Sequence, residues 1–82
     1  MDIGAAGQIA ARWLEIDLAD ARSRAEPVAD GVAVYVRAAD GRAALVDAFG
    51  RVLLARPAMT FEEHLGDFRA GWRSDYVADR VA

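Results

Sequence analysis

A hairpin signal restricts the fold of this chain more than any other feature of its sequence. Asp40-Gly41 lies between two runs of alternating apolar residues, in the stretch VAVYVRAADGRAALVDA. An Asp-Gly pair in that setting is the strongest short-range indication of a β-hairpin. A second pair of turn residues, Phe49-Gly50, separates the second run from a third, RVLLA. We therefore predict a three-stranded antiparallel meander over residues 31–56.

The two turns imply registers that agree with each other. We take Asp40-Gly41 and Phe49-Gly50 as two-residue turns. The register then places Val36, Leu45 and Leu54 on one face of the sheet, and Tyr35, Val46 and Leu53 on the other. Because both faces are apolar, each of them needs a covering layer.

The segment before the meander, residues 4–26, favours a helix because it is rich in alanine and has no internal proline. Glu26-Pro27 ends it, since a residue before proline avoids the helical conformation. Residues 14–18 nevertheless read Leu-Glu-Ile-Asp-Leu, an alternation of period two that is typical of a strand. We predict an N-terminal helix and leave helix against strand open for residues 13–18.

A second helix is predicted to begin after Thr60. Thr60 and Glu63 have the spacing of a capping box, in which each side chain accepts a hydrogen bond from the other residue's backbone N–H. Large apolar side chains then recur at helical spacing. They are Phe61, Leu65, Phe68, Trp72 and Tyr76. We leave open whether the helix continues past Gly71, because glycine costs about 1 kcal/mol relative to alanine inside a helix.

This stripe of five residues has two readings. It can cover one face of the meander, which is the reading we favour for Phe61, Leu65 and Phe68. Trp72 and Tyr76 lie beyond Gly71, and aromatic side chains that extend past the sheet are typical anchors of protein interfaces. For these two residues, core packing and contact with another protein are equally supported. All five are candidate partner-binding residues.

Length and composition predict a small domain of marginal stability, which association with a second copy would stabilise. The chain has 82 residues, which indicates one domain over 1–82. Alanine accounts for 19 of them, so few larger side chains are available for a core and stability is marginal. We therefore expect a homodimer. The net charge of −3 argues against general nucleic-acid binding and suits a basic protein partner.

The sequence also indicates the cellular compartment of the protein. Cysteine is absent, which excludes disulfides and thiolate metal sites. The start MDIGAAGQ lacks the basic and apolar regions of a secretory signal. No apolar run approaches the roughly 20 residues that span a membrane. We predict a cytoplasmic protein without a membrane segment.

One histidine is the only candidate for catalysis. His64 has Glu63 beside it and Asp67 three residues on, and a carboxylate near an imidazole is capable of acid–base chemistry. No nucleophile or second metal ligand lies at matching spacing, so we interpret His64 as part of a solvated helical face. We predict a protein that is not an enzyme and that uses no cofactor or metal.

The basic residues also have two interpretations. All ten are arginine, and four lie in the predicted sheet. These four are Arg37, Arg42, Arg51 and Arg56. A basic edge of this kind could contact a phosphate backbone. The simpler interpretation, which we favour, is that charges at turns and edges prevent strands of different molecules from pairing.

Several short motifs resemble the Phd/YefM family of antitoxins, which are small bacterial proteins. The motifs are the start MDIGAA, Glu26-Pro27-Val28 before the first predicted strand, the hairpin VYVRAADGRAALV, and a proline followed by MTFEEHL. The resemblance implies an N-terminal α/β part that dimerises and binds operator DNA, and a C-terminal helical segment that wraps a toxin. Residues 39–42 and the additional strand 51–55 depart from the family pattern, so nucleic-acid binding stays open.

The sequence therefore predicts an α+β fold with an N-terminal helix, a three-stranded antiparallel β-meander and a C-terminal helix. The function we favour is non-enzymatic: an antitoxin-like inhibitor that binds a toxin-like protein partner through residues 60–82. The alternative is a homodimeric structural module, or a small phage or host inhibitor without DNA binding.

Overall fold

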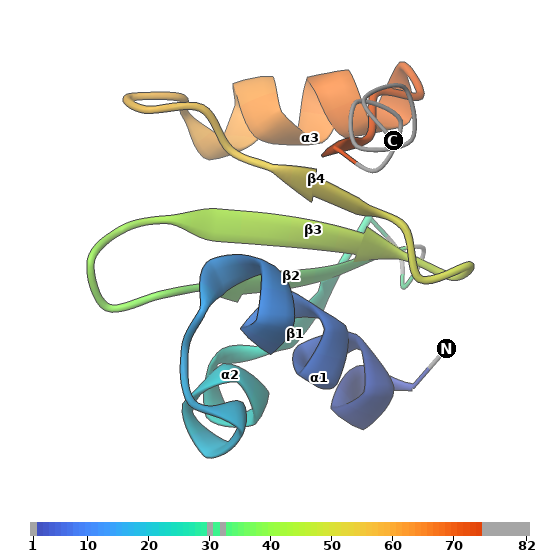
Figure 1. The fold of residues 1–82 in the computed structure, drawn as a ribbon. Helices are drawn as coiled ribbons and strands as arrows, with labels where there is room; N and C mark the ends of the chain where they lie inside the picture. The colour runs from blue at the N-terminus through green and yellow to red at the C-terminus, as the bar shows by residue number, and fades with distance from the viewer. Residues whose placement is uncertain (1, 30, 32, 75–82) are drawn as a thin grey trace, which may run out of the picture.

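The computed structural model describes residues 2–29, 31 and 33–74. Its elements are α1 (Ile3–Leu14), α2 (Leu18–Arg24), β1 (Glu26–Val28), β2 (Ala33–Arg37), β3 (Ala43–Asp47), β4 (Val52–Leu54) and α3 (Phe61–Arg69). An antiparallel sheet forms the middle layer, with α1 and α2 on one face and α3 on the other (Figure 1). The predicted α+β class is confirmed. Among the described residues, no helix is long and apolar enough to cross a membrane.

The sheet has one strand more than the sequence predicted. Strand β1 pairs antiparallel with β2, with Pro27 opposite Val34, and the strand order is β1-β2-β3-β4. Proline cannot donate to a sheet ladder, so it is tolerated at an edge, where β1 lies. The sequence analysis placed Glu26-Pro27 at a helix end, before the first predicted strand, and did not assign it to the sheet. Helix α2 does end before this pair, with Ala25 as its C-cap, but the same two residues also begin the sheet.

Both hairpin loops have three residues, not the predicted two. In the first, the Ala38 N–H donates to the Arg42 carbonyl across the loop, and Gly41 has a φ of 94°. In the second, residues 48–50 form the loop and Gly50 has a φ of 82°. A left-handed residue in the third position is the usual geometry of three-residue hairpin loops. Each loop therefore begins one residue before the pair that marks it in the sequence.

The longer loops shift both predicted registers by one position. Tyr35, not Val36, lies opposite Leu45. Leu53, not Leu54, lies opposite Leu45 on the other side. A shift of one residue exchanges the two faces of a strand, so the predicted grouping is wrong. One face carries Val34, Val36, Ala44, Val46, Val52 and Leu54, and the other carries Ala33, Tyr35, Leu45 and Leu53.

The expectation that both faces need cover is confirmed. The face that contains Val36 packs on the small residues of α1 and α2, among which Ala10 and Ala21 are completely buried. On the opposite face, Phe68 of α3 packs against Leu45. The sheet is thus the shared core of two layers that come from opposite ends of the described chain.

The N-terminal segment forms two helices instead of the single helix predicted. Helix α1 ends because Glu15 adopts a left-handed conformation, with a φ of 54°, and its N–H donates to the Ala11 carbonyl. Asp17 then caps α2 by accepting a hydrogen bond from the Ala19 N–H. Residues 13–18 are therefore a helix end, a turn and a helix start. None of these residues forms a strand, so the strand alternative is wrong.

Helix α3 begins as predicted. Thr60 Oγ1 accepts a hydrogen bond from the Glu63 N–H at 3.1 Å, and Glu63 Oε1 accepts one from the Thr60 N–H at 2.9 Å, which completes the capping box. The helix ends two residues before Gly71, whose φ of 99° favours glycine. The structure decides what the sequence left open, because α3 does not continue past Gly71. Trp72 consequently lies outside the helix, and Tyr76 lies outside the described residues.

Candidate functional site

The four described residues of the predicted stripe differ in how far they are buried. Phe68 is only 4% exposed and lies in the core, and Leu65 is half-buried beside it. Phe61 stands at the edge of the layer, where its ring contacts the Tyr35 ring edge-to-face at 5.0 Å. Trp72 is 64% exposed. Burial is thus greatest at Phe68, and Trp72 is the most exposed of the described members of the stripe.

Arg73 holds the chain in place next to Trp72. Its Nε donates to Asp47 Oδ2 at 3.0 Å, and both side chains are nearly buried, at 12% and 11% exposed. Its Nη1 donates to the carbonyls of Phe68, at 2.8 Å, and Trp72, at 2.6 Å. The guanidinium carbon also lies 3.7 Å from the centre of the Phe68 ring, which is a cation–π contact. The main chain at Trp72 is therefore fixed although its indole is exposed.

The residue after Arg73 is tied to the edge of the sheet. Ser74 Oγ accepts a hydrogen bond from the Leu54 N–H at 2.9 Å. Strand β4 is an edge of the described sheet, and unpaired edge N–H groups invite pairing with a strand from another chain. Ser74 occupies one such donor, so this part of the edge is closed by the chain's own C-terminal segment.

A shallow apolar recess adjoins Trp72. Its volume is about 420 Å³, and its lining includes Leu53, Leu54 and Met59 together with the indole. Arg56 and Asp67 also line it and form an exposed ion pair at 3.3 Å. An apolar floor with a polar border is the composition of a typical protein interface. We call this surface the Trp72 recess.

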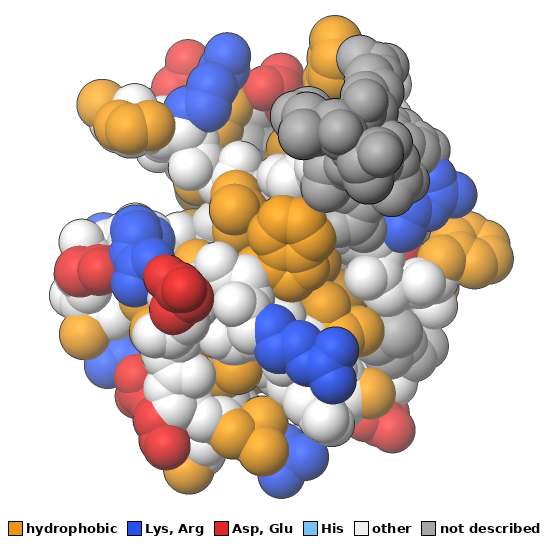
Figure 2. All heavy atoms as spheres, viewed as in Figure 1, with side chains coloured by type: hydrophobic (Ala, Val, Ile, Leu, Met, Phe, Trp, Pro, Cys, Tyr) orange, Lys and Arg blue, Asp and Glu red, His pale blue; other side chains and the backbone are white. Residues whose placement is uncertain are grey.

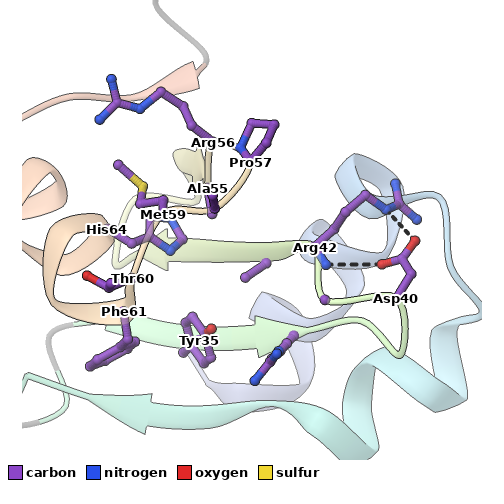
Figure 3. Close-up of a pocket in the computed structure, with 14 residues that line it drawn as sticks. Tyr35, Asp40, Arg42, Ala55, Arg56, Pro57, Met59, Thr60, Phe61 and His64 are labelled. Carbon is purple, nitrogen blue, oxygen red and sulfur yellow. Dashed lines mark hydrogen bonds and ion pairs between the residues drawn. The ribbon is translucent and has the colours of Figure 1, made fainter.

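A larger groove lies on the other side of the β4–α3 loop. It has a volume of about 700 Å³ and separates the β2–β3 turn from that loop, as the hollow at the left of Figure 2 shows. Tyr35, Phe61 and His64 lie on one side of it, with Asp40 and Arg42 across from them (Figure 3). Three arginines are among its lining residues. We call it the arginine groove.

His64 does not lie on a solvated face, and that prediction is wrong. The side chain is 1% exposed, and its Nε2 lies 2.7 Å from the Leu53 carbonyl oxygen. Because a carbonyl only accepts, Nε2 carries a proton and donates it. The sequence did contain the signal: His64 is three residues after Phe61 and four before Phe68, so it shares their helical face.

Burial sets the titration of His64. Loss of water around the ring lowers the pKa of His64, and this outweighs the hydrogen bond to Leu53 and the charge of Asp67, which raise it. The two acids near it in sequence are engaged elsewhere, Glu63 in the capping box and Asp67 with Arg56. Within the described residues, no group of three or more histidine and acidic side chains could hold a metal ion.

Stability should therefore decrease in mildly acidic solution. The folded state holds the pKa of His64 below its ordinary value of about 6.5, so the unfolded chain binds this proton more readily. We expect the free energy of unfolding, measured by urea titration with circular dichroism, to fall as the pH is lowered from neutral through 6.5. His64→Gln keeps an N–H for the Leu53 carbonyl but does not titrate. An equal pH dependence in the variant and the wild type would contradict this assignment.

Comparisons of the chain with protein-family models, with curated proteins and with solved structures found no match. The surfaces of the described residues that can accept a ligand or a partner are the Trp72 recess and the arginine groove.

Proposed function

We propose that this chain is a non-enzymatic protein–protein interaction module, an antitoxin-like inhibitor that binds its partner at the Trp72 recess. The observation that carries the proposal is the state of Trp72, which is 64% exposed on a main chain fixed by Arg73. Tryptophan is among the residues most enriched at the centres of protein interfaces. An anchor that is already held in place loses little conformational freedom on binding, which favours affinity.

The surroundings of Trp72 support the same proposal. The apolar recess beside the indole gives a partner side chain a place to pack, next to Leu54 and Met59. The Arg56–Asp67 pair at its border supplies polar groups that remain accessible to water. A buried aromatic anchor surrounded by weaker contacts that exclude water is the usual organisation of an energetic centre in an interface.

The partner includes, in this proposal, a second copy of the chain. A chain of 82 residues buries a limited core, and a dimer through the Trp72 recess adds buried apolar surface. We expect sedimentation equilibrium at micromolar concentration to give a dimer. A well-folded monomer under these conditions would leave a different protein as the partner.

Trp72→Ala is the direct test of this surface. Because the indole is exposed, we expect the variant to unfold at nearly the wild-type temperature. We expect its self-association or partner binding to weaken by about 2 kcal/mol or more, as loss of an aromatic anchor does. Sedimentation measures self-association. Capture of partners from the native host, followed by quantitative mass spectrometry, measures partner binding.

The matched control is Leu18→Ala. Leu18 is also partly exposed, but it lies on α2, on the opposite face of the sheet. A protein that is captured by the wild type and by the control, yet lost with Trp72→Ala, identifies a partner of the recess. If Trp72→Ala instead melts the protein as severely as Phe68→Ala, the indole belongs to the core and the proposal is wrong.

A further inference from the structure

The arginine groove has a charge opposite to that of the chain. Its lining contains Arg37, Arg42 and Arg56 against a single acid, Asp40, so three positive charges and one negative charge leave +2. The whole chain carries −3. The groove is thus a concave surface of net positive charge in an acidic protein, and such a surface attracts anionic groups.

The three guanidinium groups differ in their ion-pair partners. Arg42 is paired, with its Nε 2.7 Å from Asp40 Oδ2. The Arg42 backbone N–H and guanidinium hold the pKa of the Asp40 carboxyl below its ordinary value, so this pair stays ionised. Arg56 pairs with Asp67 at 3.3 Å, but its side chain is 73% exposed, and an exposed pair of this kind is weak. Two of the three positive charges therefore already have a carboxylate.

Arg37 is different. Among the described residues, its guanidinium has no ion-pair partner. It lies next to the β2–β3 turn, where a Cβ placed on Gly41 would be 4.0 Å from Arg37 Nη2. An arginine presents a planar set of N–H donors that matches a carboxylate with two parallel hydrogen bonds. Arg37 is therefore the lining arginine whose guanidinium, as far as the described residues show, stays available to a ligand.

The remainder of the lining suits an apolar side chain. Tyr35 and Phe61 pack edge-to-face at 5.0 Å, and Met59 extends the apolar wall. Within the described part of the chain, the Tyr35 hydroxyl makes no hydrogen bond, so it can serve a ligand. The volume of about 700 Å³ is in the range of sites that accept ligands of several hundred daltons, which corresponds to a few amino-acid residues.

We propose that the arginine groove binds a short acidic segment of a protein partner. One carboxylate of the segment pairs with Arg37, and a neighbouring apolar side chain packs on Tyr35, Phe61 and Met59. This inference rests on the proposed function as a protein-binding module and names the chemistry of a second contact. The segment contains both a carboxylate and an apolar side chain, which distinguishes it from a simple anion.

A peptide fits these observations better than a nucleic acid does. Nucleic-acid affinity depends on many phosphate contacts along a continuous basic surface. Here the basic surface is a single groove, and the exposed Glu62 and Glu63 directly follow one of its lining residues, Phe61, in the chain. An extended polyanion would meet these carboxylates and the net negative charge of the chain.

The test is selection of a random heptapeptide library on the full-length wild-type protein and on Arg37→Ala. We expect wild-type selection to enrich peptides with aspartate or glutamate beside an apolar residue, and Arg37→Ala to enrich none. The best peptide is then synthesised with a fluorescent label, and its affinity is measured by anisotropy. Arg37→Ala should weaken it about tenfold, which corresponds to about 1.4 kcal/mol and to the loss of one charge-assisted pair.

Three controls make the result specific. Arg12→Ala removes the same charge from an exposed position on α1, on the opposite face of the sheet, and should leave the affinity unchanged. A peptide with glutamine in place of its acids should lose binding. Trp72→Ala should bind the peptide normally, because Trp72 does not line this groove. Failure of the Trp72 experiment and failure of the groove experiment are therefore distinguishable.

Several outcomes would overturn the inference. Selection that enriches no peptides, or only basic or neutral ones, is one of them. An equal loss of affinity in Arg12→Ala and Arg37→Ala would show general attraction by charge. Tighter binding of a labelled single-stranded oligonucleotide that also depends on Arg37 would assign the groove to phosphate groups.

Discussion

Phe68→Ala should lower the free energy of unfolding by about 3–5 kcal/mol, because it removes a large buried side chain and leaves a cavity. Phe68 is 4% exposed and packs against Leu45 and Ala33 of the sheet. Its ring also supports the Arg73 guanidinium at 3.7 Å. The substitution thus removes apolar burial and weakens the attachment of the segment that carries Trp72. Urea denaturation followed by circular dichroism measures the loss.

Phe61→Ala is the control for this prediction. It removes the same side chain from the same helix, one residue after the N-cap, where the ring is 38% exposed. We expect a clearly smaller loss, because part of the ring is already in water. Equal losses at the two positions would mean that α3 packs on the sheet differently from the structure.

Asp47→Ala should lower the free energy of unfolding by about 3 kcal/mol, the lower end of the effect of removing one partner from a buried ion pair, because both side chains keep some exposure to water. The Asp47 carboxylate has two functions. Its Oδ2 accepts from Arg73, and its Oδ1 accepts from the N–H groups of Phe49 and Arg51 in the β3–β4 loop. Without it, a nearly buried guanidinium loses its counter-charge and the loop loses two acceptors. The control is Asp40→Ala, whose exposed pair with Arg42 should contribute little.

The stability that the Asp47 carboxylate contributes depends on pH. Burial raises the pKa of Asp47, but the hydrogen bonds from Arg51, Arg73 and Phe49 outweigh it and hold the pKa below its ordinary value. The stabilisation is therefore complete above the ordinary carboxyl pKa of about 3.9, and it is lost as the pH falls through the lower folded value. The difference between wild type and Asp47→Ala should shrink in that acidic range. A constant difference down to the acid limit would contradict the assignment.

The parts of this fold that the sequence predicted are those with local signals. Thr60 and Glu63 specify the start of α3 because the capping box involves residues three apart. The hairpins were placed correctly for the same reason. Their registers were not, because an Asp-Gly pair marks a turn without stating whether the loop has two residues or three. Strand β1 was missed because its three residues, which include Pro27, are too few to show a pattern.

The candidate site was less predictable. Trp72 was singled out because it continued the helical stripe beyond Gly71. The contact that fixes its main chain joins Arg73 to Asp47 across 26 positions, and no local pattern reports such a pair. The arginine groove likewise requires the β2–β3 turn to face the β4–α3 loop, which follows only from the correct register. His64 is an intermediate case, since its spacing placed it on the core face although its polarity suggested water.

The strand order β1-β2-β3-β4 has a consequence for how the chain folds. Each strand pairs with its immediate neighbours in sequence, so the sheet can close one short loop at a time, and topologies with such local contacts fold rapidly. The attachments of the third layer span greater separations, 11 residues from Leu53 to His64 and 26 from Asp47 to Arg73. During synthesis the N-terminal helices and the sheet emerge first. The surface around Trp72, which we propose binds a partner, is thus completed after the helices and strands that support it have emerged.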